Sequence, residues 1–370
     1  MMNNNSYILE PEKYLCYKSM VKYERLSNLI NDYYKNSDSN QIELYIDVSS
    51  FIDQLIKKAD QMQNKINTGD NLFISAWILN MCAHYRRFFR TRYSVETTIF
   101  LICRNIGNNG SEFRRLINCV EYDRGMASEA WTTIFNYNMD IINDVILYVP
   151  NMEIVRTNYD FNSKALYIMN MRQNDDIPAM IISDDMINLQ LCATTPKDVC
   201  VLIPSKSGSE DNSALLGQKD AVSYYISKKR ISSAALFESD PYFYIPLMGA
   251  MSGCKNRGFK SIYSISQTVS AINKLFSDGL ISPGNPTSVD RVIMLISSMY
   301  PKRAINNKQI VDRFNCLSAA MQSMFFFNNI IGDQMDINQY GRMINLYNPA
   351  AVKEIVSKVF VNHEIDLNNL

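Results

Sequence analysis

Ala179-Met-Ile-Ile-Ser-Asp-Asp-Met-Ile-Asn-Leu-Gln-Leu191 is the stretch that decides the fold class of this 370-residue chain. Its first four residues are apolar without interruption, which is typical of a central parallel strand covered on both faces. Asp184 and Asp185 follow the strand, at the carboxyl edge where open α/β sheets bind their ligands. Acidic residues in this place predict a metal or phosphate site.

The same pattern occurs earlier, in Glu43-Leu-Tyr-Ile-Asp-Val-Ser-Ser-Phe51, where an apolar run again ends at an aspartate, Asp47. Two explanations are open for an aspartate in this position. It can cap the next helix, because its side-chain oxygens accept backbone N–H groups. Alternatively, the two strand ends face one another and form one functional site.

Strands and helices alternate along the chain. The hydrophobic pattern predicts strands at 42–47, 97–103, 152–155, 179–183 and 199–203, and helices at 7–40, 50–66, 71–90, 111–146 and 161–171. From 242 onward the pattern is helical, with further helices at 288–300, 305–330 and 348–360. This order predicts an α/β fold with a mostly parallel central sheet, helices on both faces and a C-terminal helical region.

The linker Ile281-Ser-Pro-Gly-Asn-Pro-Thr287 marks a domain boundary. The domains that we predict are an N-terminal helical lead-in at 1–40, an α/β domain at 41–280 and a C-terminal helical domain at 288–370.

Composition excludes several classes of protein. Lys+Arg and Asp+Glu are equal at 37 each, so no overall positive field draws the chain onto nucleic acid or an anionic membrane. No stretch approaches the run of about 18 apolar residues that spans a membrane, and the N-terminus lacks a signal-peptide pattern. We therefore expect a soluble, cytoplasmic protein. Asn, Ile, Met, Tyr and Lys are heavily used, which is typical of AT-rich genomes such as those of many bacteriophages.

Cysteine and histidine do not form a recognisable site in the sequence. The eight cysteines include no Cys-x-x-Cys pair, and His84 and His363 are the only histidines, so structural zinc is disfavoured. Cys82, Cys103 and Cys192 lie in apolar runs, and we expect them to be core residues in a reducing compartment.

The ordered motifs between residues 42 and 275 resemble the flap endonuclease and 5′-3′ exonuclease family of PIN-like nucleases. Leu44-Tyr-Ile-Asp47 is similar to the first strand with its metal-binding aspartate, and Ile99-Phe-Leu-Ile-Cys103 to the second strand. Phe113-Arg-Arg115 and Glu121-Tyr-Asp-Arg124 are similar to the basic segment that follows in such enzymes. The match is strongest over 180–191, which resembles the family's strand, serine, paired aspartates and leucine-rich helix start.

The chain departs from the family where the metal-binding acids stand. Arg104-Asn105 replaces an aspartate after the second strand, and Asp160-Phe-Asn-Ser163 keeps one carboxylate of an acidic motif. The paired aspartates become Asp185 and Ile187, with Asp184 at the family's glycine position. The resemblance therefore implies catalytic residues reduced to Asp47, Asp160 and Asp185, with Asp184 as an additional metal ligand.

These losses decide what chemistry remains. Two-metal hydrolysis of a phosphodiester needs two ions about 3.5–4 Å apart, whereas the surviving acids suffice to hold one Mg²⁺ or Mn²⁺ weakly. Arg104 at a former ligand position repels a cation and can pair with the remaining carboxylates. We predict that Asp47, Asp160 and Asp185 meet in one cleft at the carboxyl edge, with Arg104 beside them.

Local clusters of basic and aromatic residues predict contacts with nucleic acid, because arginine binds phosphates and aromatic rings stack on unpaired bases. The cluster in 84–93 has an alternative explanation, a helix with an apolar face and a solvated arginine face. Phe259-Lys-Ser-Ile-Tyr-Ser-Ile265 replaces the family's glycine-rich hairpin, which predicts a weaker grip on duplex. The candidate nucleic-acid-binding residues are Arg86, Arg87, Arg90, Arg92, Arg114, Arg115, Arg124, Lys255 and Arg257.

Three functions remain open from the sequence. The first is a nuclease-fold protein with a decayed two-metal site that binds branched or single-stranded nucleic acid, or a viral protein partner, in viral DNA metabolism. The second is an active Mg²⁺- or Mn²⁺-dependent 5′ nuclease. The third is a structural or scaffolding protein of a viral assembly. A viral protein of any of these kinds works in the host cytoplasm or in the virion.

Overall fold

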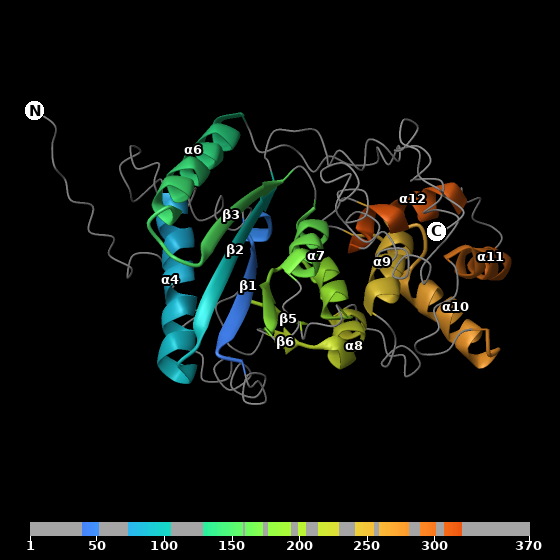
Figure 1. Cartoon of the computed structure of the whole chain (residues 1–370). Coiled ribbons are helices and arrows are strands. Elements are labelled where there is room, and N and C mark those ends of the chain that lie inside the picture. The colour runs from blue at the N-terminus through green and yellow to red at the C-terminus, as the bar shows by residue number, and fades with distance from the viewer. Residues whose placement is uncertain are drawn as a thin grey trace, which may run out of the picture.

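A computed structural model gives the fold of the chain (Figure 1). The structure describes residues 39–51, 73–104, 129–157, 160–172, 177–193, 199–204, 214–228, 241–254, 259–280, 289–300 and 307–319. The predicted helices at 7–40 and 348–360, the linker at 281–287 and most of the predicted helix at 50–66 lie outside the described residues.

A six-stranded sheet forms the centre of the molecule, in the order β3-β2-β1-β4-β5-β6. The strands are β1 (Gln41–Asp47), β2 (Glu96–Arg104), β3 (Met152–Thr157), β4 (Ala179–Ile182), β5 (Val199–Ile203) and β6 (Ala214–Leu216). The first five are parallel, and β6 runs antiparallel to β5. The predicted α/β fold with a mostly parallel sheet is therefore confirmed, while the short strand β6 was not predicted.

Helices cover both faces of the sheet (Figure 1). The elements are α4 (Phe73–Tyr93), α6 (Glu129–Ile146), α7 (Phe161–Arg172), the 3₁₀ helix η2 (Met186–Ala193), α8 (Gln218–Lys228) and α9 (Pro241–Ser252). Alternate strand residues enter different cores: Leu44 and Ile46 pack with α4 and α6, and Tyr45 packs with α7, η2 and α9. Both faces of the central strands are therefore buried, as their continuous apolar runs predict.

The C-terminal helices pack into the core on the α7 side of the sheet. They are α10 (Ile265–Ser277), α11 (Val289–Met299) and α12 (Asn307–Leu317). The rings of Phe243 in α9 and Phe314 in α12 lie 5.7 Å apart, and Arg313 donates to the carbonyl oxygens of Ala250 and Lys260. The predicted boundary between the α/β and helical domains falls in residues that are not described, but the described helices on either side of it share one hydrophobic core.

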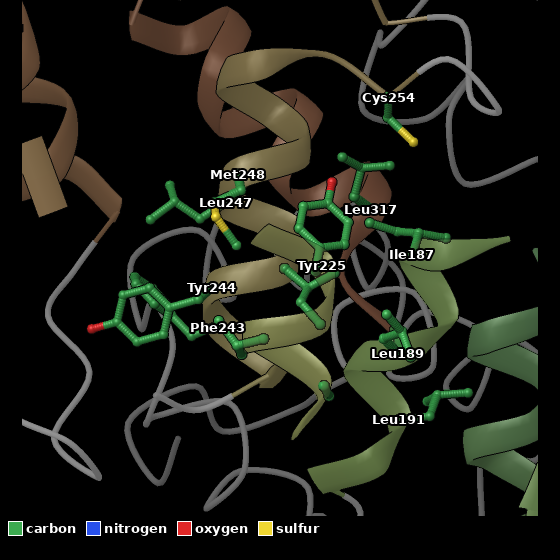
Figure 2. Close-up of a cluster of buried hydrophobic side chains, with 14 of the residues drawn as sticks. Ile187, Leu189, Leu191, Tyr225, Phe243, Tyr244, Leu247, Met248, Cys254 and Leu317 are labelled. Carbon is green, nitrogen blue, oxygen red and sulfur yellow. The ribbon is translucent and has the colours of Figure 1, made fainter. Parts of the chain in front are cut away.

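Close packing at Gly249 joins α9 to η2 and α12. A Cβ atom at this position would lie 2.9 Å from Leu317 Cδ1 and 3.4 Å from Ile187 Cδ1. Figure 2 shows Ile187, Tyr225 and Leu317 gathered beside α9. The last turn of α12 is thereby fixed against the segment that follows β4.

We predict that Phe314→Ala lowers the free energy of unfolding by about 3–5 kcal/mol, because it leaves a cavity in a fully buried site. Urea denaturation measures this change, and Met294→Ala on the exposed side of α11 is the control, with a change within about 0.5 kcal/mol. Since α12 shares the core, unfolding of the variant should stay a single transition. A separate early transition that leaves the sheet intact would contradict the shared core.

Candidate functional site at the carboxyl edge

The candidate site lies where the sheet changes direction in its strand order. The chain runs from β1 outward to β2 and β3, then returns to place β4 on the other side of β1. In open α/β sheets the crevice outside the carboxyl ends of such diverging strands is the usual place for a ligand. Asp47 ends β1, and Ser183, Asp184 and Asp185 follow β4, so all four residues stand at this point.

The Asp47 carboxylate is the centre of a buried hydrogen-bond network. Its Oδ1 accepts from the backbone N–H of Ser50 at 3.1 Å. Its Oδ2 accepts from the Ser183 hydroxyl at 2.9 Å and from the Asn188 side-chain amide at 3.0 Å. Asp47 is only 2% exposed, and Ser183 and Asn188 are fully buried. The ends of β1 and β4 thus face one another and are joined by direct bonds.

Helix capping accounts for part of the acidic pattern. Asp47 accepts from Ser50, which lies in the short helical turn that follows β1. Asp185 Oδ1 likewise accepts from the N–H of Ile187 in the first turn of η2. The capping explanation therefore holds for both aspartates, while a functional site at this edge stays a prediction.

Asp160 also stands at a helix start on the carboxyl edge. It is 1% exposed and directly precedes α7, where its carbonyl oxygen accepts from the Ser163 hydroxyl and the Lys164 N–H. Lys164 lies in the first turn of α7, and burial lowers the pKa of its ammonium group to about 8. Asp160 follows β3, which is separated from β1 by β2. The predicted acids thus all lie at the carboxyl edge of the sheet. Their joint use as metal ligands stays a prediction.

The described carboxylates of this edge do not meet in one metal-binding cluster. Within the part of the chain that the structure describes, no three His, Cys, Asp or Glu side chains are grouped so that they could hold a metal ion. Asn188 Oδ1 is buried with no hydrogen-bond partner in the described structure, and such an oxygen suits a hard cation or a water molecule. The Asp47 carboxylate beside it already accepts at least three hydrogen bonds.

Buried side-chain amides attach the end of α12 to this edge. The carbonyl oxygen of Leu317 accepts from Asn162 at 3.2 Å and from Gln190 at 2.9 Å, and Gln190 Oε1 accepts from the Ala319 N–H at 2.7 Å. Asn162 is two residues from Asp160, and Gln190 is two residues from Asn188. Helix α12 is therefore bonded to the segments that carry the candidate acids.

Arg104 is the last residue of β2, the neighbour of β1, so its backbone lies at the carboxyl edge. Its side chain is outside the described residues, and its pairing with the acids stays a prediction. Five predicted nucleic-acid-binding residues are also outside the described residues, namely Arg114, Arg115, Arg124, Lys255 and Arg257.

The arginines of α4 stand at the opposite edge of the sheet from Asp47. Arg87, Arg90 and Arg92 are exposed and Arg86 is half-buried, all in the last turns of α4. The helix ends just before β2 begins, where the Glu96 N–H donates to the Asn40 carbonyl at the start of β1. Figure 1 shows this end of α4 joined to the beginning of β2. The predicted arginine cluster and the predicted acids thus do not form one continuous site.

The inner face of α4 is apolar, so the alternative explanation of its sequence also holds. Met81, Cys82, Tyr85 and Phe89 are buried against the sheet. Burial lowers the pKa of His84 to about 4, so this imidazole is neutral at physiological pH. No hydrogen bond or ion pair joins the four arginine side chains to other described residues. Their guanidinium groups are available to an external anion.

A backbone bridge joins the end of α9 to the segment that precedes α10. Cys254 and Phe259 form an antiparallel bridge through two backbone hydrogen bonds of 3.0 Å each. Gly253 takes a positive φ of 89°, and Arg313 donates to the Lys260 carbonyl oxygen beside the bridge. Residues 255–258 lie outside the described residues, and the weaker grip on duplex stays a prediction.

Solved structures that are similar to this chain include bacteriophage T5 nuclease structures. One is the 5′-exonuclease with bound zinc ions, at 11% identity and a TM-score of 0.46. Another is the flap endonuclease in a complex with DNA and metal ions, at 11% identity and a TM-score of 0.44. In both cases the match covers 86% of this chain and 99% of the other. The fold resembles that of a 5′-exonuclease. No family model and no curated protein sequence matches the chain.

Ser183, Asn188 and Gln190 are site residues that the sequence did not identify as such. Asn188 and Gln190 alternate with apolar residues, a pattern that also describes the wet face of an exposed segment. The signal that distinguishes them is their position directly after a strand-ending aspartate pair.

Among the described helices, none is long and apolar enough to cross a bilayer.

We predict that Asp47→Ala destabilises the metal-free protein by about 3–5 kcal/mol, since it leaves the Ser183 and Asn188 donors buried without their acceptor. Urea denaturation in the presence of a chelator measures the change. Asp144→Ala on the exposed side of α6 is the control, with an effect within about 0.5 kcal/mol. If Asp47→Ala instead raised the free energy of unfolding, the result would show that the Asp47 carboxylate is a metal ligand that is strained when no metal is bound.

Proposed function

We propose that this protein binds nucleic acid on a nuclease-like fold and has lost two-metal hydrolysis. The observation that carries the proposal is the hydrogen bonding of the Asp47 carboxylate. Three donors, from Ser50, Ser183 and Asn188, use most of its lone pairs, which number about four. An ion bound directly to Asp47 would compete with these buried donors for its lone pairs.

Binding of one divalent ion is the most that we propose for this edge. Asp184 and Asp185 are 9% and 7% exposed, and Asn188 Oδ1 supplies a further oxygen. Mg²⁺ and Mn²⁺ accept carboxylate and carbonyl oxygens together with water, so such a set holds one Mg²⁺ or Mn²⁺ weakly. One ion does not stabilise both the attacking and the leaving oxygen of a phosphodiester.

The arginines of α4 are the surface that we propose for nucleic acid. Arg87 and Arg90 lie one turn apart on the exposed side of the helix, and Arg92 follows in the last turn. Like charges at this spacing destabilise a helix slightly, although the negative end of the helix dipole offsets part of that cost. The phosphates of a nucleic-acid backbone neutralise the charges of all three arginines together. β1 is seven residues long, so this surface lies about 20 Å from Asp47.

A nucleic-acid strand bound to the α4 arginines is held away from the acids at the carboxyl edge, which fits a binding protein better than a nuclease. Arginine with neighbouring aromatic residues favours single or branched strands, because unpaired bases expose their faces for stacking. We place this activity in viral DNA metabolism, with further viral proteins as partners, in the host cytoplasm or the virion. Composition typical of phage genomes and the sequence motifs support that setting.

We predict that the purified protein with Mg²⁺ or Mn²⁺ cuts flap, nicked and single-stranded DNA little or not at all. Loss of the second ion removes several kcal/mol of transition-state stabilisation, equivalent to about a thousandfold or more in rate. Gel assays over a metal titration measure cleavage, and Asp185→Ala is the control for contaminating nuclease, since the trace that remains should be the same in both proteins. Strong turnover that disappears in Asp185→Ala would establish an active nuclease.

We predict that Arg87→Gln/Arg90→Gln weakens binding to a labelled single-stranded oligonucleotide by about tenfold. The salt dependence should also fall, by about 0.7 in the slope of log K against log salt for each phosphate that the variant no longer neutralises. Fluorescence anisotropy at several salt concentrations measures both quantities. The charge-matched control is Lys274→Gln/Lys308→Gln, which removes two exposed lysines from α10 and α12. Equal binding by both variants would remove α4 from the interface, and no binding by the wild type at low salt would favour a scaffolding role.

A further inference from the structure

Helix α6 carries an apolar stripe on its outer side. Among the described residues, the exposed large hydrophobic side chains are concentrated on α6 and the turn after it, with Tyr137 53%, Val145 37%, Leu147 75% and Tyr148 87% exposed. Within α6, Tyr137, Ile141 and Val145 are spaced by four residues, which aligns them on one side of the helix, and Tyr148 lies in the turn that follows. These four residues are the α6 stripe. Contiguous exposed apolar surface of this kind marks an interaction site.

The inner face of α6 is separate from the stripe and is already packed into the core. Phe135, Met139 and Ile142 are buried in the core beside α4. Asn138, also fully buried, accepts from the Ser75 N–H of α4 at 2.9 Å, which fixes the rotation of the helix. The α6 stripe is therefore a second apolar face and not a core face turned outward.

The charges on α6 indicate the chemistry of its partner. The helix contains Glu129, Asp140 and Asp144 and no basic residue. Asp140 and Asp144 lie in a row beside the stripe. Asp140 follows Tyr137 by three residues, and Asp144 follows Ile141 by three. Asp140 pairs with Arg156 of β3 at 2.6 Å, and Asp144 is exposed at the end of the row. A second copy of α6 would bring acid against acid, and an anionic membrane or nucleic acid would be repelled in the same way.

We propose that the α6 stripe binds an amphipathic helix of a partner protein whose apolar ridge is flanked by Lys or Arg. The helical part of the stripe, from Tyr137 to the end of α6 at Ile146, is about 14 Å long, or between two and three turns, and Tyr148 lies in the turn that follows. This length matches the i, i+4, i+7 anchors of a helix that lies along another surface. Tyr137 and Tyr148 anchor its two ends, and Asp144 pairs with a basic residue of the partner. The site is independent of both Asp47 and the α4 arginines.

A pair of labelled 18-residue model peptides tests the proposal. One has a leucine ridge flanked by lysine, and the other has glutamate in place of every lysine. By fluorescence anisotropy, the lysine peptide should bind the full-length protein at least tenfold more tightly than the glutamate peptide. Tyr137→Ser/Tyr148→Ser should weaken lysine-peptide binding at least tenfold, and Asp144→Lys should reduce or reverse the preference between peptides. Met294→Ser, which removes an exposed apolar side chain from α11, is the matched control and should bind as the wild type does.

Several results would overturn the proposal. One is equal affinity for the two peptides, and another is no binding of either. Unchanged peptide binding by Tyr137→Ser/Tyr148→Ser, or an equal loss of binding in Met294→Ser, would show that the peptide binds elsewhere on the protein. A dimer in sedimentation experiments that Tyr137→Ser/Tyr148→Ser abolishes would assign the stripe to a second copy of the chain. All substituted residues are exposed, so circular dichroism should show unchanged folding, and nucleic-acid binding should stay intact.

Discussion

The buried carboxylate of Asp47 is the interaction on which the rest of the structure depends. A carboxylate taken out of water costs several kcal/mol unless its oxygens are bonded. Ser183 and Asn188 supply those bonds from the segment after β4, and hydrogen bonds to a charged group contribute about 1.5–3 kcal/mol each. They therefore hold β1 and the chain after β4 together at the centre of the sheet. In the function that we propose, the same bonds compete with a metal ion for the carboxylate oxygens.

A second set of buried amides extends this arrangement to the end of the described chain. Gln190 and Asn162 bind the backbone at Leu317, and Gly249 allows the close approach of α9 to that residue. Each amide is fully or almost fully buried, so its loss would strand backbone groups without partners. Part of the carboxyl edge is thus bonded to α12, the last helix that the structure describes. The exposed functional surfaces that we propose are accordingly elsewhere, on α4 and α6.

Much of the fold follows from local sequence, and the site follows only in part. Continuous apolar runs predicted β1, β2, β4 and β5, because strands buried on both faces need apolar residues throughout. The three-residue β6 and the weakly amphipathic α8 give no such signal and were missed. Asn188 and Gln190 were missed because their burial depends on contacts with distant residues. The position of the α4 arginines was predictable in principle, since a helix that connects parallel strands must end at the amino edge.

The most direct test of the account is anomalous diffraction from a crystal soaked in Mn²⁺, which counts ions and identifies their ligands. The account predicts no Mn²⁺ bound to Asp47, retention of its bonds to Ser183 and Asn188, and at most one weakly occupied ion near Asp184 and Asp185. Two strong anomalous peaks about 3.5–4 Å apart, with Asp47 as a ligand and the Ser183 bond broken, would contradict it.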